Sequence, residues 1–501
     1  MDGHLLIQWA AALTGLFFFV ALGAIVGSFI NVLVYRLPRG LNVVTPPSAC
    51  PACGTRLTWR QNIPILGWIL LRGRCRFCRS PISPEYPLVE LAVALVFALL
   101  WTLWFMYPSP LPFLGMHPHA WRPDFAAWGV ARMWPTLLIA LVLISSLVAA
   151  TLVDARTFMI PLVLPWVAGA VGVLTHTLHA AWIGARSSID FSPHLWTIPA
   201  HPGWRMGLAL GATLGLVVSN LLLRAGLIRQ SFADYAQWEA SAREAEKQRQ
   251  SAAASTPAST PSPAAPRSII SGVLLLTGPA IALMLFGFSL GMSSGHSLPF
   301  ATIGGALGLI LGLVLRRAAP SADHPDSDED PIWVRYPHTR REMLRELAFL
   351  APPISLGLLG AWLASPSGLL GGLAASPPLW MIALAGSLLG LIVGGALVWG
   401  VRLLGSLALG KEAMGLGDVH LMAAAGACVG WIDVTLAFFV APFLGIAWAV
   451  LSVFSRQLFH RAGTALPYGP HLAAATIAVM LFKPVFETAL SALAGWQVNL
   501  P

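Results

Sequence analysis

Long apolar segments separated by polar loops constrain the fold of this chain more than any other feature of its sequence. Of its 501 residues, 56% are hydrophobic and only 10% are charged, and the mean hydropathy is +0.73. Apolar runs of about 20 residues are long enough to cross a bilayer as helices. The sequence therefore predicts an all-α polytopic membrane protein, a bundle of about twelve transmembrane helices. They are expected near residues 5–30, 87–106, 133–153, 159–180, 206–224, 269–290, 300–316, 347–365, 379–404, 418–432, 434–454 and 467–493.

The loop between the first two spans sets the predicted topology. From Arg36 to Tyr86 it contains eight arginines, and its only acidic residue is Glu85. Because basic loops stay in the cytoplasm, this loop is predicted to be cytoplasmic and the N-terminus to lie outside. The first apolar run lacks a basic segment and a cleavage site of small residues, which favours a retained span over a cleaved signal. The net charge of +9 then reflects topology and contact with membrane lipid. It does not indicate nucleic-acid binding, because the arginines are spread over short loops.

Two polar segments lie in the middle of the chain. Residues 248–267 are rich in Ser, Ala, Pro and Thr, a composition typical of a disordered linker. The charged residues just before them, 233–250, suggest a short surface helix. Residues 320–331 form an acidic loop without the spacing of a calcium site, and we interpret it as a solvated run of charge.

Four of the five cysteines lie in the first predicted cytoplasmic loop as two Cys-x-x-Cys pairs. Cys50 and Cys53 are separated from Cys75 and Cys78 by 21 residues. Four thiolates spaced in this way can close a tetrahedral zinc site in a loop too short to build its own core. Disulfides are the alternative, but a reducing compartment disfavours them. A site with four protein ligands is closed, so the predicted zinc is structural and does not activate water.

Two aspartates stand out against the apolar background. Asp418 lies in the run Gly415-Leu-Gly-Asp-Val419, and Asp154 ends the third predicted span. Alternation of the spans places both at the cytoplasmic face, and an ionisable residue at a membrane boundary is by default a functional hypothesis. Asp418 could instead simply cap the helix that follows it. Because carboxyl groups from two distant spans can meet in a bundle, the pair favours catalysis.

Several motifs, in order, resemble the type IV prepilin peptidase family. Around the four-cysteine loop they are Gly27-Ser-Phe-Ile-Asn-Val-Leu-Val-Tyr-Arg-Leu-Pro38 and Pro81-Ile-Ser-Pro-Glu-Tyr-Pro-Leu-Val-Glu90. Further along they are Asp154-Ala-Arg-Thr-Phe-Met-Ile-Pro161, Gly415-Leu-Gly-Asp-Val419 and Leu466-Pro-Tyr-Gly-Pro470. The resemblance covers residues 20–180 and 385–490.

The resemblance implies an aspartic endopeptidase with Asp154 and Asp418 as its catalytic residues. Such an enzyme removes the basic leader of prepilins or pseudopilins, after a glycine, at the cytoplasmic face of the bacterial inner membrane. Two carboxyl groups held close together do not both ionise easily, so one keeps a proton. The ionised group can then act as general base toward water while the protonated one polarises the amide carbonyl. The sequence does not divide these roles between the two residues.

The resemblance also implies a second activity and a set of partners. Members with the four-cysteine loop methylate the new N-terminus using S-adenosylmethionine, although no motif marks residues that bind this donor. The implied partners are prepilin or pseudopilin substrates, and components of the pilus or type II secretion machinery are a further hypothesis.

The chain departs from the family pattern in three respects. Members usually have about eight spans, so about four of the predicted spans, between 190 and 375, are extra. His420 stands where the family commonly has Lys, and Leu162 where it often has a second acid. The predicted division is a first transmembrane helix (1–35), a zinc loop (36–86), helices with the first aspartate (87–185), inserted helices (186–378) and a C-terminal peptidase core (379–501).

Two other interpretations remain open. A Gly-x-Gly-Asp intramembrane protease of the presenilin-like group would keep the aspartate chemistry but act on other helices, and the zinc loop argues against it. A non-catalytic assembly scaffold or a solute transporter would need neither aspartate. A transporter should show repeated, interrupted helices in two halves, and the sequence contains no such repeat.

Overall fold

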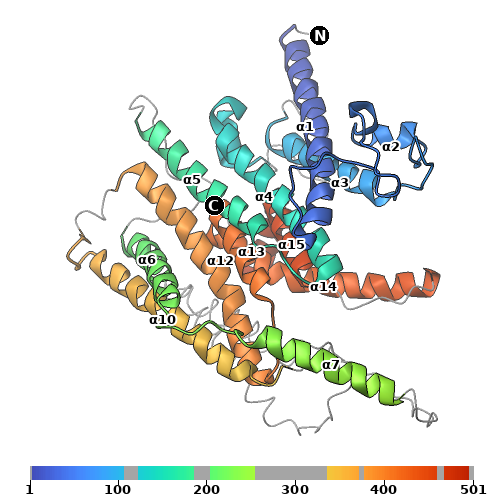
Figure 1. The fold of residues 1–501 in the computed structure, drawn as a ribbon. Coiled ribbons are helices and arrows are strands. Elements are labelled where there is room, and N and C mark those ends of the chain that lie inside the picture. Colours follow the sequence, from blue (N-terminus) through green and yellow to red (C-terminus); the bar gives the residue numbers. More distant parts are fainter. Residues whose placement is uncertain are drawn as a thin grey trace.

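The protein is a bundle of long helices (Figure 1), which confirms the predicted all-α membrane fold. The computed structural model describes residues 3–106, 122–185, 203–253, 336–371, 377–459 and 468–495. These ranges contain no β-strand, only two isolated bridges. Eight described helices are long and apolar enough to cross a membrane. They are α1 (Gly3–Arg36), α3 (Glu85–Trp104), α4 (Val130–Thr157), α5 (Val163–Gly184), α6 (Trp204–Arg224), α10 (Thr339–Leu363), α12 (Leu379–Leu409) and α14 (Trp431–Phe459).

Two of the expected spans are not single helices of membrane length. The one expected at 418–432 is present close to its expected bounds as α13 (Leu416–Val429), an apolar helix of 14 residues. The one expected at 467–493 is a bent pair, α15 (Gly469–Leu481) and α16 (Lys483–Ala494), whose axes differ by 89°. The bend falls before Pro484, because proline lacks an N–H and its ring clashes with the carbonyl four residues earlier.

The remaining expectations concern the polar segments and two further spans. The predicted surface helix is present as α7 (Tyr235–Ala253), so the first residues of the expected disordered linker are helical. The rest of that linker, the acidic loop 320–331 and the spans at 269–290 and 300–316 lie outside the described residues. The first loop contains α2 (Leu66–Leu70) and two 3₁₀ turns, Leu37–Arg39 and Trp59–Gln61, and a third turn, Asp124–Trp128, precedes α4.

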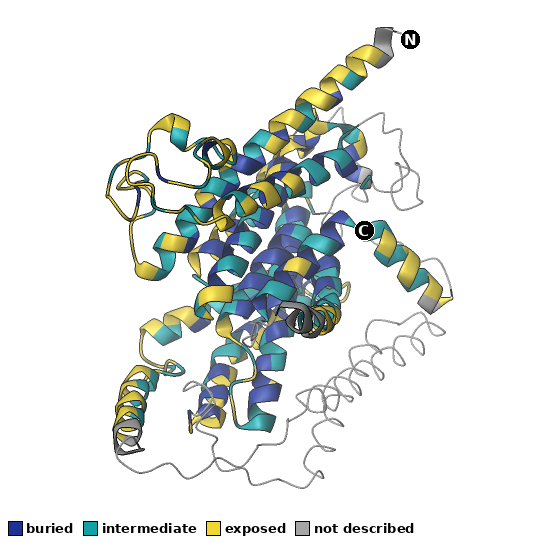
Figure 2. Ribbon diagram, turned by 90° about the vertical axis from the view of Figure 1, so that its right-hand side faces the viewer, coloured by how far each residue is buried: buried dark blue, intermediate teal, exposed yellow. Residues whose placement is uncertain are grey.

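The helices form a central group flanked by two smaller ones. In the centre, α13 is in contact with α4, α5, α12, α14 and α15. On one side α1 packs on α3, with the four-cysteine loop beside them, and on the other side α6 packs on α10 and both contact α12 (Figure 1). Figure 2 shows that buried residues concentrate in the central helices, whereas the first loop is largely exposed.

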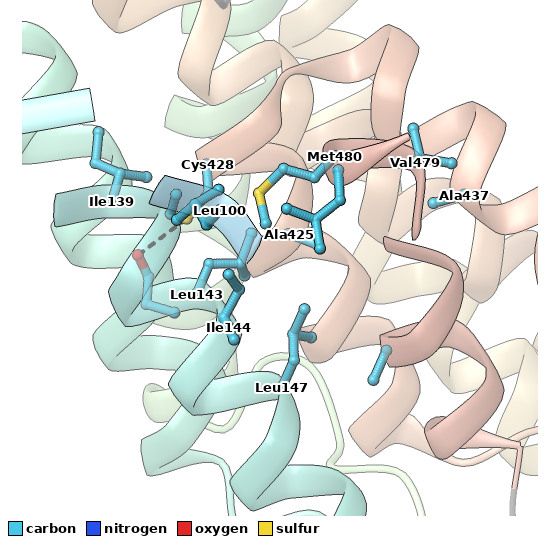
Figure 3. Close-up of a cluster of buried hydrophobic side chains, with 14 of the residues drawn as sticks. Leu100, Ile139, Leu143, Ile144, Leu147, Ala425, Cys428, Ala437, Val479 and Met480 are labelled. Carbon is cyan, nitrogen blue, oxygen red and sulfur yellow. Dashed lines mark hydrogen bonds between the residues drawn. The ribbon is translucent and has the colours of Figure 1, made fainter. Parts of the chain in front are cut away.

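Apolar side chains from helices far apart in sequence make up the core. Leu143, Ile144 and Leu147 of α4 lie beside Ala425 and Cys428 of α13 in Figure 3, and all five are buried. Small residues in α13 let neighbouring helices approach closely, which is how membrane helices gain packing energy in the absence of a hydrophobic driving force between them.

The contact between Gly390 of α12 and Gly426 of α13 leads to a first prediction. A Cβ atom on Gly390 would lie 2.0 Å from the carbonyl oxygen of Gly426. Gly390→Ala is therefore expected to force the helices apart and to destabilise the protein by about 1–3 kcal/mol. Thermal unfolding in detergent measures the effect. Gly400→Ala in the same helix is the matched control, because a Cβ there has nothing within 4 Å. Equal stability of the two variants would contradict the close packing.

Candidate functional site

Asp154 lies at the end of α4, where the chain reverses. Its side chain is buried. The reversal follows at once, because Phe158 adopts a left-handed conformation (φ 55°) and its N–H donates to the carbonyl of Asp154 over 2.9 Å. Ile160 and Pro161 then lead into α5. Asp154 is thus held on the last turn of a packed helix and not on a loop.

Asp418 is the third residue of α13, and it is buried. The N-cap position belongs to Gly415, so Asp418 does not cap the helix from that position. Its carboxylate instead interacts with the backbone N–H of Gly415, which is one of the two bonds of a capping box, since glycine has no side chain to make the other. Asp418 therefore helps to fix the first turn of its own helix, while its Oδ1 atom lies toward Gly469 of α15.

Gly469, the first residue of α15, lies between the two aspartates. A Cβ atom on it would lie 2.6 Å from Oδ2 of Asp154 and 3.1 Å from Oδ1 of Asp418. The two carboxyl oxygens are consequently at most about 5.7 Å apart, a separation that one water molecule can bridge. Ile160 packs against the same point, with its Cδ1 atom 3.2 Å away. The structure thus brings together two aspartates 264 positions apart in sequence.

The four cysteines of the first loop form a second cluster. Their Sγ atoms all lie within 4.8 Å of one another, so they could hold a metal ion. The Sγ atoms of Cys50 and Cys78 are 3.8 Å apart. A tetrahedron of sulfurs about 2.3 Å from a zinc ion has edges of about 3.8 Å, which matches this separation. All five cysteines are free, so the disulfide alternative is wrong.

Both Cys-x-x-Cys pairs are shaped by the same turn. The N–H of Gly54 donates to the carbonyl of Cys50 over 2.9 Å, and that of Arg79 to Cys75 over 3.0 Å. Gly54 and Arg79 are left-handed, with φ of 68° and 56°. The side chain of Thr55 lies 3.3 Å from Sγ of Cys53, and its hydrogen bond to the thiolate lowers the pKa of that cysteine to about 6. The turns hold all four thiols toward one point, as a zinc site requires.

Glu90 fastens this loop to the helices. Its Oε2 atom accepts the N–H of Ile65 over 2.6 Å. On α1, the side chain of Asn31 donates to the carbonyl of Tyr86 over 3.1 Å. Glu90 therefore orients the loop and does not cap α3, the helix in which it lies and whose N-cap is Pro84.

Comparison with known proteins identifies the family of this chain. Residues 21–104 match the family model described as Bacterial Peptidase A24 N-terminal domain. A prepilin leader peptidase/N-methyltransferase of Pectobacterium carotovorum subsp. carotovorum is 32% identical over 244 residues, which span 41% of this chain and 77% of that protein. This chain belongs to the prepilin leader peptidase/N-methyltransferase family.

Other members of the prepilin leader peptidase/N-methyltransferase family match a shorter part. The one from Myxococcus xanthus (strain DK1622) is 38% identical over 145 residues, 29% of this chain and 35% of that protein. The one from Klebsiella pneumoniae is 38% identical over 155 residues, 30% of this chain and 56% of that protein. The chain thus spans between a third and about three quarters of the length of these relatives. No solved structure matches it significantly.

In this family member, the two departures from the motif follow the aspartates in sequence, His420 two positions after Asp418 and Leu162 eight positions after Asp154. The ring of His420 lies 5.9 Å from that of Trp166 on α5, so the side chain that replaces the usual Lys packs against an aromatic residue. Leu162, in place of a second acid, is exposed.

Sequence reasoning missed one buried cluster in this family member. Arg402 of α12 is only 2% exposed and pairs with Glu346 of α10 and with Glu412. The sequence feature that could have revealed this cluster is an arginine inside the predicted span 379–404. Charged residues within spans usually face the bundle interior and pair there.

Proposed function

We propose that this chain is an aspartic endopeptidase of the bacterial inner membrane that removes the basic leader of type IV prepilins or pseudopilins. The observation that carries the proposal is the meeting of Asp154 and Asp418 around Gly469. The family to which the chain belongs supports the substrate class. We place the two aspartates near the cytoplasmic face, where the basic first loop puts them by the positive-inside rule.

The chemistry follows from two carboxyl groups that can share one water molecule. Close carboxyl groups keep one proton between them. The ionised group takes a proton from the water as its oxygen attacks the scissile amide carbonyl, and the protonated group polarises that carbonyl and later helps to protonate the leaving amine. The pair titrates as a unit, so we assign the roles to the pair and not to either residue.

We further propose that the same chain methylates the new N-terminus with S-adenosylmethionine as methyl donor. The names of the relatives support this activity. No residue of the described chain is assigned to the donor. The test is cleavage of a model prepilin with a basic leader, Gly before the cut and Phe after it, by the purified protein in detergent with S-adenosylmethionine. Mass spectrometry of the product is expected to show a free N-terminus carrying one methyl group. Intact prepilin after incubation with folded protein would overturn the peptidase proposal.

The four cysteines are proposed to hold a structural zinc ion, and this gives a second prediction. Cys50→Ser is expected to reduce the zinc content from one ion per chain to a small fraction, because thiolate ligands supply most of the binding energy. Elemental analysis of the purified protein measures it. Cys428→Ala is the control, since Cys428 lies in α13, outside the cluster, and should leave the zinc in place. Wild-type protein without zinc would contradict the assignment.

A further inference from the structure

Arg402 carries a buried charge that the proposed chemistry does not use. It lies within α12, and its side chain is 2% exposed. A buried guanidinium is costly unless it is paired and its hydrogen bonds are satisfied. Its partners therefore show what the residue holds in place.

One side of the guanidinium is held by helix α10. Nη2 of Arg402 donates to Oε1 of Glu346 over 2.9 Å, and Nε donates to both oxygens of the same carboxylate. The indole N–H of Trp399 also donates to Glu346, over 2.6 Å. Arginine and carboxylate thus meet in a forked, charge-assisted pair, which fixes orientation as well as position.

The other side of the guanidinium holds the segment that leads to Asp418. Nη1 of Arg402 donates to the carboxylate of Glu412 and to the carbonyl oxygen of Met414. Between them, the N–H of Ala413 donates to the hydroxyl of Ser406 over 3.0 Å. Three consecutive residues of the connection between α12 and α13 are therefore tied to α12, and Asp418 follows four residues after the last of them.

Helix α10 makes a second contact at the same place. Nε of Arg340 donates to the carbonyl of Leu407 in the last turn of α12, over 3.1 Å. Its guanidinium also lies beside Gly410, the left-handed residue that ends α12. α10 thus contacts the start of the connection directly, through Arg340. It contacts the middle of the connection indirectly, because Glu346 holds Arg402 and Arg402 holds Glu412 and Met414.

We propose that Glu346 and Arg402 are positioning residues for Asp418, so that helix α10 is required for leader cleavage. α10 lies in the region 186–378 that extends beyond the resemblance to the family core. The inference rests on the proposed peptidase function. It assigns to α10 the task of fixing residues 410–415, and through them the first turn of α13 that presents Asp418 to Asp154.

Glu346→Gln and Glu412→Gln test the inference, with Glu239→Gln on the exposed helix α7 as the matched control. Both test variants are expected to lower kcat for a model prepilin by about tenfold to a hundredfold, with KM within about twofold, because a displaced catalytic group affects reaction more than binding. Arg402→Lys keeps the charge without the fork, and we expect it to retain more activity than Arg402→Met. Glu412, with a side chain 23% exposed, offers a variant that should fold even if a change at Glu346 does not.

Hydrogen exchange gives a readout that does not depend on activity. Amides of residues 410–418 are expected to exchange about tenfold faster in Glu346→Gln than in wild type. In Glu239→Gln their exchange rates are expected to match those of the wild type. Methylation of a pilin already lacking its leader should be unaffected in all three variants. If both test variants cleaved the prepilin with the kcat of the wild type and showed the same hydrogen exchange as the wild type, the inference would be overturned and the peptidase function would stand. If the folded wild type did not cleave the prepilin, the proposed function itself would be overturned. Unchanged exchange in Glu346→Gln would then refute, separately, the positioning of residues 410–418 by Glu346.

Discussion

Replacing either aspartate, as Asp154→Asn or Asp418→Asn, is expected to lower the rate of leader cleavage by about 10²–10⁴-fold. Asparagine keeps the size of the side chain and can still accept a hydrogen bond, so the Asp418→Asn variant can keep the interaction with the N–H of Gly415. The amide cannot take up a proton from water. The loss should therefore appear in kcat, measured by the release of mature pilin in detergent.

The same two variants supply their own controls. Zinc content and thermal unfolding should match the wild type, and a pilin that already lacks its leader should still be methylated. A variant with wild-type cleavage would show that its aspartate is not one of the reacting pair. If both cleaved normally, the chain would be better explained as an assembly scaffold, which tolerates the loss of either carboxyl group.

Gly469→Ala is expected to disable cleavage without removing any reactive group. The new methyl group would lie 2.6 Å from Oδ2 of Asp154 and 3.1 Å from Oδ1 of Asp418. It must push the carboxylates apart and occupy the place of the water between them. A displacement of about 1 Å can cost about 10²-fold in rate, so we expect a fall in kcat of that order.

Gly400→Ala is the control for this change, since a Cβ on Gly400 meets nothing within 4 Å. Both substitutions replace glycine by the better helix former, so neither should weaken its helix through propensity. Cleavage and thermal stability are measured side by side. Full activity of Gly469→Ala would mean that the two carboxylates do not react across this point.

The parts of the site that the sequence could predict are those marked by local patterns. The paired cysteines and the run ending in Asp418 each carry their chemistry within a few residues, and Asp154 is marked by its place at the end of an apolar span. The structure brings both sets together. Zinc and the catalytic role of the aspartates stay predictions that the experiments above address.

The parts that could not be predicted depend on which helix faces which. Glu346 and Arg402 lie 56 positions apart, and hydropathy does not tell which side of α10 turns toward α12. The depth that α13 reaches in the membrane is a related case. Residues 421–432 are all apolar and a span was expected over 418–432, yet α13 ends at Val429, before Gly430 with its positive φ of 90°, and it is too short to cross the hydrocarbon layer.

The shortness of α13 has a consequence for how a hydrolase can work inside a membrane. Fourteen residues of helix measure about 21 Å, whereas the hydrocarbon layer is about 30 Å thick. Because other helices surround α13, this shortfall need not be met by lipid. A helix of this length cannot reach both surfaces of the hydrocarbon layer. We expect its first turn, with Asp418, to be the end nearer to water, so that the second reactant of the proposed hydrolysis reaches the aspartates without a pore across the bilayer.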